Sequence, residues 1–172
     1  KILYGRVQLE RAASLFYFEK KGPIQALIHD LKYRGNEELS FYLGSWLGEI
    51  LFEAGWKRSI DVVIPVPLHR QRMRERGYNQ VTTFGLALST ELGISYNDSL
   101  LFRTTYSKTQ SKKNRLDRSE GIDTFFDIQF NDKDHDKHYL LVDDVITTGA
   151  TLEACSRALL KIPGARVSIV CM

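Results

Sequence analysis

The run from Tyr139 to Thr151 constrains the fold more than any other part of this 172-residue chain. Its first residues, Tyr139 to Val142, are apolar or aromatic and too few for a helix of their own, so they suit a buried strand. Two adjacent carboxylates, Asp143 and Asp144, follow at once, and a loop of hydroxyl residues and glycine then leads into an apolar-periodic helix. Open α/β sheets bind ligands at such strand ends. The run therefore predicts an α/β fold with a binding site where this strand ends.

The chemistry of the run suits a phosphorylated sugar. Carboxylates only accept hydrogen bonds, so Asp143 and Asp144 suit a sugar diol or a hard cation such as Mg²⁺. The loop that follows consists of Thr147, Thr148, Gly149, Ala150 and Thr151. Its glycine permits backbone angles that let several N–H groups converge on one anion, and the helix beginning near Thr151 adds a partial positive charge. A diol or metal site beside a phosphate site fits a ribose 5-phosphate.

A plainer interpretation of these residues exists beside the functional one. Aspartate after a strand and threonine before a helix are ordinary loop and capping residues. A pair of aspartates after an apolar strand also occurs in phosphoacceptor receiver domains. The complete string, rather than the acid pair alone, is what favours a phosphate site.

Strand-like and helix-like segments alternate along the chain, which predicts a mainly parallel sheet flanked by helices. The expected strands are 61–66, 100–104, 125–130, 139–142 and 166–171, with a short strand or packed extended segment at 14–18. The expected helices are 22–31, 39–51, 78–92 and about 151–161. We expect one domain over 1–172, in which an N-terminal helical segment (1–58) packs on a core (59–172).

Composition agrees with a globular protein, at 43% hydrophobic and 26% charged residues. No apolar run approaches the ~18–20 residues that a membrane helix needs, so we expect no membrane insertion. Cys155 and Cys171 lack the spacing of a zinc site or a disulfide framework, which favours a reducing cytoplasm.

Basic residues concentrate in two segments, although the net charge is only +3. Residues 69–80 hold four arginines and one glutamate, and residues 103–118 hold six basic residues and one aspartate. Such segments could neutralise a polyphosphate or follow a nucleic-acid backbone.

The first of these segments begins just after a proline-stiffened loop. Pro65 and Pro67 end the strand at 61–66, and Leu68, His69 and Arg70 follow. If this strand runs parallel to the one before Asp143, the loop lies at the same sheet edge, where a rigid turn and arginines would suit a pyrophosphate. The alternative is a stiff loop followed by a solvated arginine-rich helix.

Two resemblances sharpen these expectations. The run of hydrophobics, two acids, two hydrophobics and Thr-Thr-Gly-x-Thr resembles the phosphoribosyl pyrophosphate (PRPP) motif of type I phosphoribosyltransferases. The string VIPVPLHRQRMRERGYNQ resembles a signature of the ComF family of phosphoribosyltransferase-like competence proteins. Further matches to the pattern of that family are the segment Ile28 to Gly35, Arg103, Thr109-Gln110, Arg118 and Phe125-Phe126. The resemblance covers roughly residues 14 to 171.

The resemblance implies a type I phosphoribosyltransferase-like fold and a PRPP site. Asp143 and Asp144 would hold the ribose hydroxyls, directly or through Mg²⁺, and the loop from Thr147 to Thr151 would hold the 5-phosphate. Leu68, His69 and Arg70 would meet the pyrophosphate. The segment 103–118 would be a mobile lid from which Arg103 or Arg118 reaches the leaving group, so the implied catalytic residues are Asp143, Asp144, Arg103 and Arg118. Lys32 and Arg34 are weaker candidates.

Two features depart from the family pattern. Gly121 stands where family members commonly carry an asparagine, three residues after the arginine that matches Arg118. Many members also carry an N-terminal four-cysteine zinc module. This chain lacks one and begins at Lys1, from which we expect that the module was removed.

Three functions stay open. One is a Mg²⁺-dependent phosphoribosyltransferase that acts on an unidentified base or amine. The second is a PRPP-binding competence factor that assists DNA uptake without turnover, with single-stranded DNA or the competence machinery as partner and a homodimer as one arrangement. The third is a PRPP-responsive regulator. The basic segments lack the interleaved aromatic residues of a stacking platform for single strands, which favours phosphate ligands.

Overall fold

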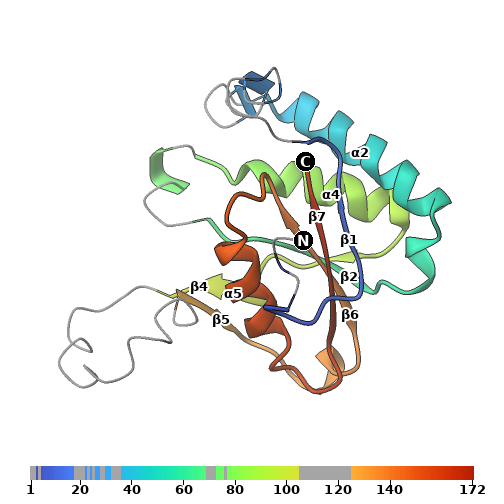
Figure 1. Ribbon diagram of the computed structural model, residues 1–172, viewed down its shortest axis with the longest axis vertical. Coiled ribbons are helices and arrows are strands. Elements are labelled where there is room, and N and C mark those ends of the chain that lie inside the picture. The colour runs from blue at the N-terminus through green and yellow to red at the C-terminus, as the bar shows by residue number, and fades with distance from the viewer. Residues whose placement is uncertain are drawn as a thin grey trace.

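A five-stranded, wholly parallel sheet forms the centre of the molecule, with strand order β1-β7-β6-β2-β3 (Figure 1). The computed structural model describes residues 3, 5–17, 22, 24, 26–27, 30–31, 36–68, 73–75, 77–104 and 125–172. The strands of this sheet are β1 (Ala12–Ser14), β2 (Val62–Pro65), β3 (Ser95–Tyr96), β6 (His138–Asp143) and β7 (Arg166–Cys171). This α/β architecture confirms the predicted fold class.

The register brings the two sequence features of interest to one sheet edge. Val62 pairs with Tyr139 and Pro65 with Val142, so β2 and β6 run in the same direction and end side by side. The proline loop after β2 and the acid pair at the end of β6 therefore lie together at one edge of the sheet. This placement was predicted on the condition that the two strands are parallel, as they are.

Alternation along the strands divides the core between the two faces of the sheet. Tyr139 and Leu141 of β6 pack in the cluster that contains the residues of α5 (Ala150–Leu159). Leu140 and Val142 pack in the other cluster, with α2 (Glu37–Glu53) and α4 (Gln80–Leu92). Because both faces are covered, the central strands read as continuous apolar runs instead of alternating ones.

Each long helix begins or ends at a residue suited to that position. The Asn36 side chain accepts a hydrogen bond from the Leu39 N–H at the start of α2, and Asn79 caps α4 in the same way through the Val81 N–H. Gly93 ends α4 in the left-handed conformation that glycine adopts without strain. The short 3-10 helices η1 (Trp56–Arg58) and η4 (Asp132–Asp134) lie in connecting segments.

Two predicted strands do not join the main sheet. β4 (Leu101–Arg103) and β5 (Phe126–Ile128) form a separate antiparallel pair, in which Arg103 lies opposite Phe126. Leu101 and Phe126 are buried in the same cluster as the apolar residues of α5, so the pair is anchored on that helix.

The other differences from prediction are local. The strand expected at 14–18 lies at Ala12–Ser14 and pairs with β7, so the N-terminal segment adds an edge strand as well as helix. β3 was not predicted, because two residues carry no detectable period. Within the predicted helix 22–31, Ile24, Ala26, Leu27, Asp30 and Leu31 are helical. Among the described helices, none combines the length and apolar character needed to cross a membrane.

Candidate functional site

A cavity of about 240 Å³ lies at the carboxyl edge of the sheet, where β2 and β6 end. Segments far apart in the sequence line it: the loop after β2, the start of α4, the end of β4 and the run from Asp143 to Thr151. Its lining residues are Val66, Pro67, Leu68, Asn79, Gln80, Arg103, Asp143, Asp144, Val145, Thr147 and Thr151.

The two aspartates are held in different ways. Asp143 continues the alternation of β6 on the side of Tyr139 and Leu141, and its Oδ1 accepts the backbone N–H of Asp144 at 2.8 Å. Asp144 is 9% exposed; its Oδ1 accepts the Val145 N–H at 2.6 Å, and its Oδ2 accepts the side-chain amide of Gln80 at 2.7 Å. Donors on both oxygens fix the carboxylate of Asp144, which is the preorganisation that a diol or metal ligand requires.

The loop after the acid pair leaves backbone donors available at the start of α5. Gly149 is the N-cap residue, with φ of 79°, and no side chain provides a cap hydrogen bond. The Thr148 hydroxyl lies 3.4 Å from the Ala150 N–H, at the long limit of a hydrogen bond. Thr147, Thr148 and Thr151 are exposed. A helix start with this geometry can accept an anion through its first N–H groups.

Tyr78, Asn79 and Gln80 form a group of positioning residues that the sequence did not assign a role. The Tyr78 hydroxyl donates to the Leu31 carbonyl, and the Asn79 side chain donates to the Val66 carbonyl at 3.0 Å. Gln80 holds Asp144. Three consecutive residues thus tie the N-terminal segment, the proline loop and the acid pair to the start of α4. The Gly-Tyr-Asn-Gln string could be recognised in the sequence as part of the family signature. The hydrogen bonds that its side chains make could not be predicted from it.

Arg103 lies in the same cavity as the acid pair, although β4 is not part of the main sheet. Its guanidinium carbon is 5.3 Å from the ring centroid of Phe126 and 6.0 Å from that of Phe125. Stacking on aromatic rings orients a guanidinium while leaving donors for an anion. The Phe-Phe pair of the family pattern therefore contacts the arginine of that pattern.

Several predicted site residues lie outside the described residues. These are His69, Arg70 and Arg118, the weaker candidates Lys32 and Arg34, and the lid segment beyond Thr104. Leu68, of the same predicted pyrophosphate group, lines the cavity. The roles predicted for all of these residues stay predictions.

The carboxylates of Asp143 and Asp144 would hold Mg²⁺ only together with further oxygen atoms from a bound ligand. Among the described residues, no group of three or more His, Cys, Asp or Glu side chains is placed to hold a metal ion. Mg²⁺ in proteins keeps several waters and is bound through one or two carboxylates together with substrate phosphates. Asp143 and Asp144 therefore fit an ion that a phosphate ligand helps to hold.

The cysteines are unsuited to nucleophilic chemistry. Burial raises the pKa of the Cys155 thiol well above its ordinary value, and the Asp143 carboxylate raises it further. Burial also raises the pKa of Cys171, with Asp143 and Asp144 acting in the same direction. Both thiols are free and buried. A neutral thiol in an apolar setting is a packing group.

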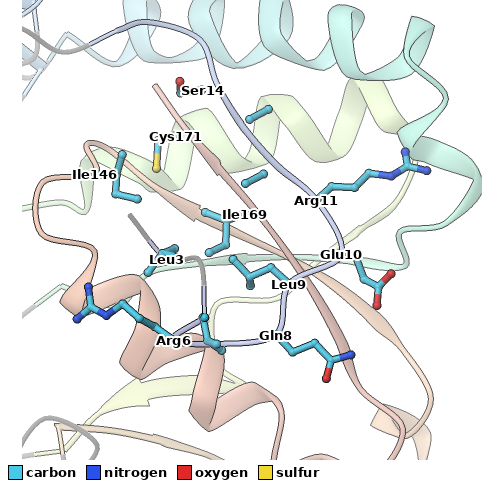
Figure 2. Close-up of a pocket in the computed structure, with 14 residues that line it drawn as sticks. Leu3, Arg6, Gln8, Leu9, Glu10, Arg11, Ser14, Ile146, Ile169 and Cys171 are labelled. Carbon is cyan, nitrogen blue, oxygen red and sulfur yellow. The ribbon is translucent and has the colours of Figure 1, made fainter. Parts of the chain in front are cut away.

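A larger cavity, of about 840 Å³, lies between the N-terminal segment and β7. Figure 2 shows the side chains of Leu3, Leu9 and Ile169 gathered at its centre, while Glu10 and Arg11 extend outward. Ile146 contributes to its wall from the loop behind the acid pair. The apolar centre offers little to orient a sugar or a phosphate, so the smaller cavity is the better candidate site despite its size.

The parallel sheet, its helices on both faces and the loop at its carboxyl edge define an α/β protein consistent with the type I phosphoribosyltransferase-like class. Competence protein F of Haemophilus influenzae is 30% identical over 148 residues, which cover 81% of this chain and 63% of that protein. DNA utilization protein YhgH of Escherichia coli strain K12 is 28% identical over 153 residues, covering 87% and 66%. Competence protein ComFC of Bacillus subtilis is 37% identical over 102 residues, covering 58% and 38%.

These relatives, at 28% to 37% identity, support the assignment of the chain to the ComF family. The chain spans 63% to 66% of the length of the first two of these relatives. No protein-family model matches the chain.

Proposed function

We propose that this chain binds PRPP with Mg²⁺ and transfers ribose 5-phosphate to a nitrogen nucleophile, with release of pyrophosphate. The observation that carries the proposal is the cavity in which the acid pair, the glycine-containing loop, the proline loop and Arg103 meet. Each of these matches one chemical part of PRPP: the diol, the 5-phosphate and the pyrophosphate.

The proposed roles follow from the contacts. Asp144, held by Gln80 and by the Val145 N–H, accepts a ribose hydroxyl, and Asp143 accepts the neighbouring one or binds Mg²⁺. The backbone N–H groups from Gly149 to Thr151 take the 5-phosphate at the start of α5. Bound Mg²⁺ would supply positive charge to the departing pyrophosphate.

Catalysis in this scheme is electrostatic. The bond from the anomeric carbon to pyrophosphate breaks as the nitrogen nucleophile approaches, so positive charge develops on the ribose and negative charge on the leaving group. The two aspartates face the first charge, and Arg103, oriented by Phe125 and Phe126, faces the second. Such a reaction needs positioning more than a protein nucleophile, which agrees with the inert cysteines.

Thermal unfolding with PRPP and Mg²⁺ tests the site. At a ligand concentration about 100 times Kd, we expect Tm to rise by about 5–10 °C. The Asp143→Asn, Asp144→Asn double variant should lose the rise, because neutral amides hold the diol and the cation less well. Asp98→Asn, an exposed residue outside the cavity lining, should keep it. An unchanged Tm of the parent protein would contradict the site assignment.

Pyrophosphate release then tests transfer. PRPP is incubated with a panel of bases and amines, and turnover of one member supports the enzyme. Arg103→Ala should lower kcat by about tenfold or more while the Tm rise persists, because its role lies with the leaving group. PRPP binding without turnover of any acceptor would contradict the transferase and leave the binding proposal intact.

A second function is favoured by the names of the relatives, which refer to competence and to DNA utilization. In this proposal the chain takes part in DNA uptake, and the cavity binds PRPP without turnover. The basic segment that includes Arg74, which is exposed, would contact the DNA backbone. Arg74→Ala should then weaken binding to single-stranded DNA and reduce its salt dependence, and an unchanged salt slope would count against a DNA role for this residue.

The remaining expectations belong with these proposals. A cytoplasmic location agrees with two free, buried thiols. A homodimer and a PRPP-responsive regulatory role stay predictions, which sedimentation with and without PRPP would test.

A further inference from the structure

Arg6 joins the N-terminal segment to the loop that precedes α5. Its Nη1 donates to the Thr148 carbonyl oxygen at 2.9 Å, and its Nη2 lies 2.7 Å from Glu153 Oε2. Arg157 closes the group, since its Nη2 donates to the Arg6 carbonyl at 2.6 Å and lies 3.1 Å from Glu153 Oε1. In Figure 2 the Arg6 side chain extends away from the centre of the larger cavity.

The hydrogen bond to Thr148 sets the direction of the next backbone N–H. In a trans peptide the C=O of one residue and the N–H of the following residue point in opposite directions, and the described residues contain no cis peptide bond. Because Arg6 holds the Thr148 carbonyl on its own side, the N–H of Gly149 points away from Arg6. Without Arg6, the described contacts between residues of the loop would hold its backbone only weakly, since the Thr148 hydroxyl lies 3.4 Å from the Ala150 N–H.

The ion pair adds an electrostatic effect. Glu153 lies in the first turn of α5 with its side chain only 16% exposed, next to the helix start that would receive a phosphate. A carboxylate there favours the helix itself but repels a bound anion. Arg6 and Arg157 neutralise this charge from two sides.

We propose that Arg6 is a positioning residue for the phosphate loop, acting through the Thr148 carbonyl and through neutralisation of Glu153. The proposal rests on the proposed function, since it assigns the 5-phosphate of PRPP to this loop. Arg6 does not touch the ligand in this scheme. The N-terminal segment thereby becomes part of the machinery that binds phosphate.

Two measurements on the full chain test the proposal. Hydrogen exchange of the Glu153 amide, which donates to the Gly149 carbonyl at 2.8 Å, reports the order of the loop without ligand. Titration calorimetry reports the affinities for PRPP, ribose 5-phosphate and inorganic pyrophosphate. Arg11→Ala is the matched control, because Arg11 belongs to the same segment and lines the same cavity but lies over the Trp56 ring. Arg6→Lys keeps the charge and loses the planar, two-sided contact.

Arg6→Ala should speed exchange of the Glu153 amide several-fold and weaken the binding of PRPP and ribose 5-phosphate about five- to tenfold. Affinity for pyrophosphate should not change, which separates this role from a general loss of structure. Adding Glu153→Gln should restore part of the phosphate affinity but not the exchange protection. Arg6→Lys should fall between the parent and Arg6→Ala, and Arg11→Ala should match the parent.

The outcomes separate the two proposals. A parent protein that binds neither PRPP nor ribose 5-phosphate contradicts the proposed function, whatever Arg6 does to the loop. A parent that binds both, with Arg6→Ala indistinguishable from Arg11→Ala in exchange and in affinity, overturns the role of Arg6. Equal weakening of all three ligands also overturns it, because the effect would then be general.

Discussion

At the scale of single residues, the contact between Gln80 and Asp144 shows how a neutral side chain can prepare a charged one. The amide of Gln80 donates to one oxygen of Asp144, and the backbone of Val145 donates to the other. The main chain of Gln80 is itself held, since the Ser40 hydroxyl donates to the Gln80 main-chain carbonyl at 3.1 Å. Asp144 therefore keeps one orientation before any ligand arrives, which lowers the cost of ordering on binding.

Gln80→Glu should damage the site by charge rather than by shape. It would place a second carboxylate beside a buried one, so we expect PRPP affinity to fall by at least about tenfold and the free energy of unfolding to fall by about 1–3 kcal/mol. The loss of stability should shrink on acidification, as the pair of carboxyl groups takes up a proton. Denaturant unfolding between pH 7.5 and 5 measures this, with the exposed Gln129→Glu as control. A loss independent of pH would contradict the electrostatic explanation.

At the scale of elements, close packing of α2 on α4 determines where Asn79 and Gln80 stand. Gly44 of α2 faces α4 so closely that a Cβ there would lie 2.5 Å from the Phe84 carbonyl oxygen and 2.7 Å from the Ala87 Cβ. Gly48 is similar, with the Glu91 side chain at 2.6 Å. Helices that approach this closely shift as units when a side chain is inserted. The start of α4, which carries the site contacts, depends on this interface.

Gly44→Ala should therefore cost stability even though alanine favours helix. Overpacking against the α4 backbone costs about 1–3 kcal/mol and the gain in helix propensity offsets up to about 1, so we expect a net loss of about 1–2 kcal/mol. PRPP affinity should fall as well, because α4 is displaced. Glu49→Ala, an exposed position of the same helix, is the control in denaturant unfolding. A more stable Gly44→Ala variant would show that the helices separate without cost.

At the scale of the whole molecule, the amino end of the sheet buries a titratable group far from the site. His138 begins β6, is 2% exposed, and its Nε2 lies 2.9 Å from the Ser168 hydroxyl. Burial lowers the pKa of His138 below its ordinary value of 6.5, and Arg166 acts in the same direction. The Ser59 backbone, Glu10 and Asp61 raise it to a smaller extent. The folded protein therefore favours the neutral imidazole.

The sign of the pH effect follows from this shift. The unfolded chain takes up the proton first as the pH falls through about 6.5, so the contribution of His138 to stability is present above that pH and is lost below it. Urea unfolding at several pH values between 7.5 and 5.5 should show this decline. His138→Gln should flatten it, because glutamine does not titrate in this range. An equally steep decline in His138→Gln would assign the effect to other groups.

Much of the fold could be predicted because the relevant information is local. The strand from Arg166 to Cys171 matches its prediction, and α4 and α5 lie within two residues of theirs. Apolar runs bounded by glycine, proline and charged residues report burial directly. The strands at 100–104 and 125–130 were also predicted, but their pairing with each other was not. A strand carries no local mark of the sheet it will join.

The same distinction between local and tertiary information applies to the candidate site. The residue types in the run from Asp143 to Thr151 predicted a diol-and-phosphate site, because carboxylates and helix starts act locally. The partners came only from the tertiary structure: Gln80 is 64 residues from Asp144, and Arg6 is 142 residues from Thr148. Such contacts depend on strand order and on which helix covers which face. The period of the apolar residues predicts which side chains face the core. The contacts that these side chains make there depend on the order of the strands in the assembled sheet.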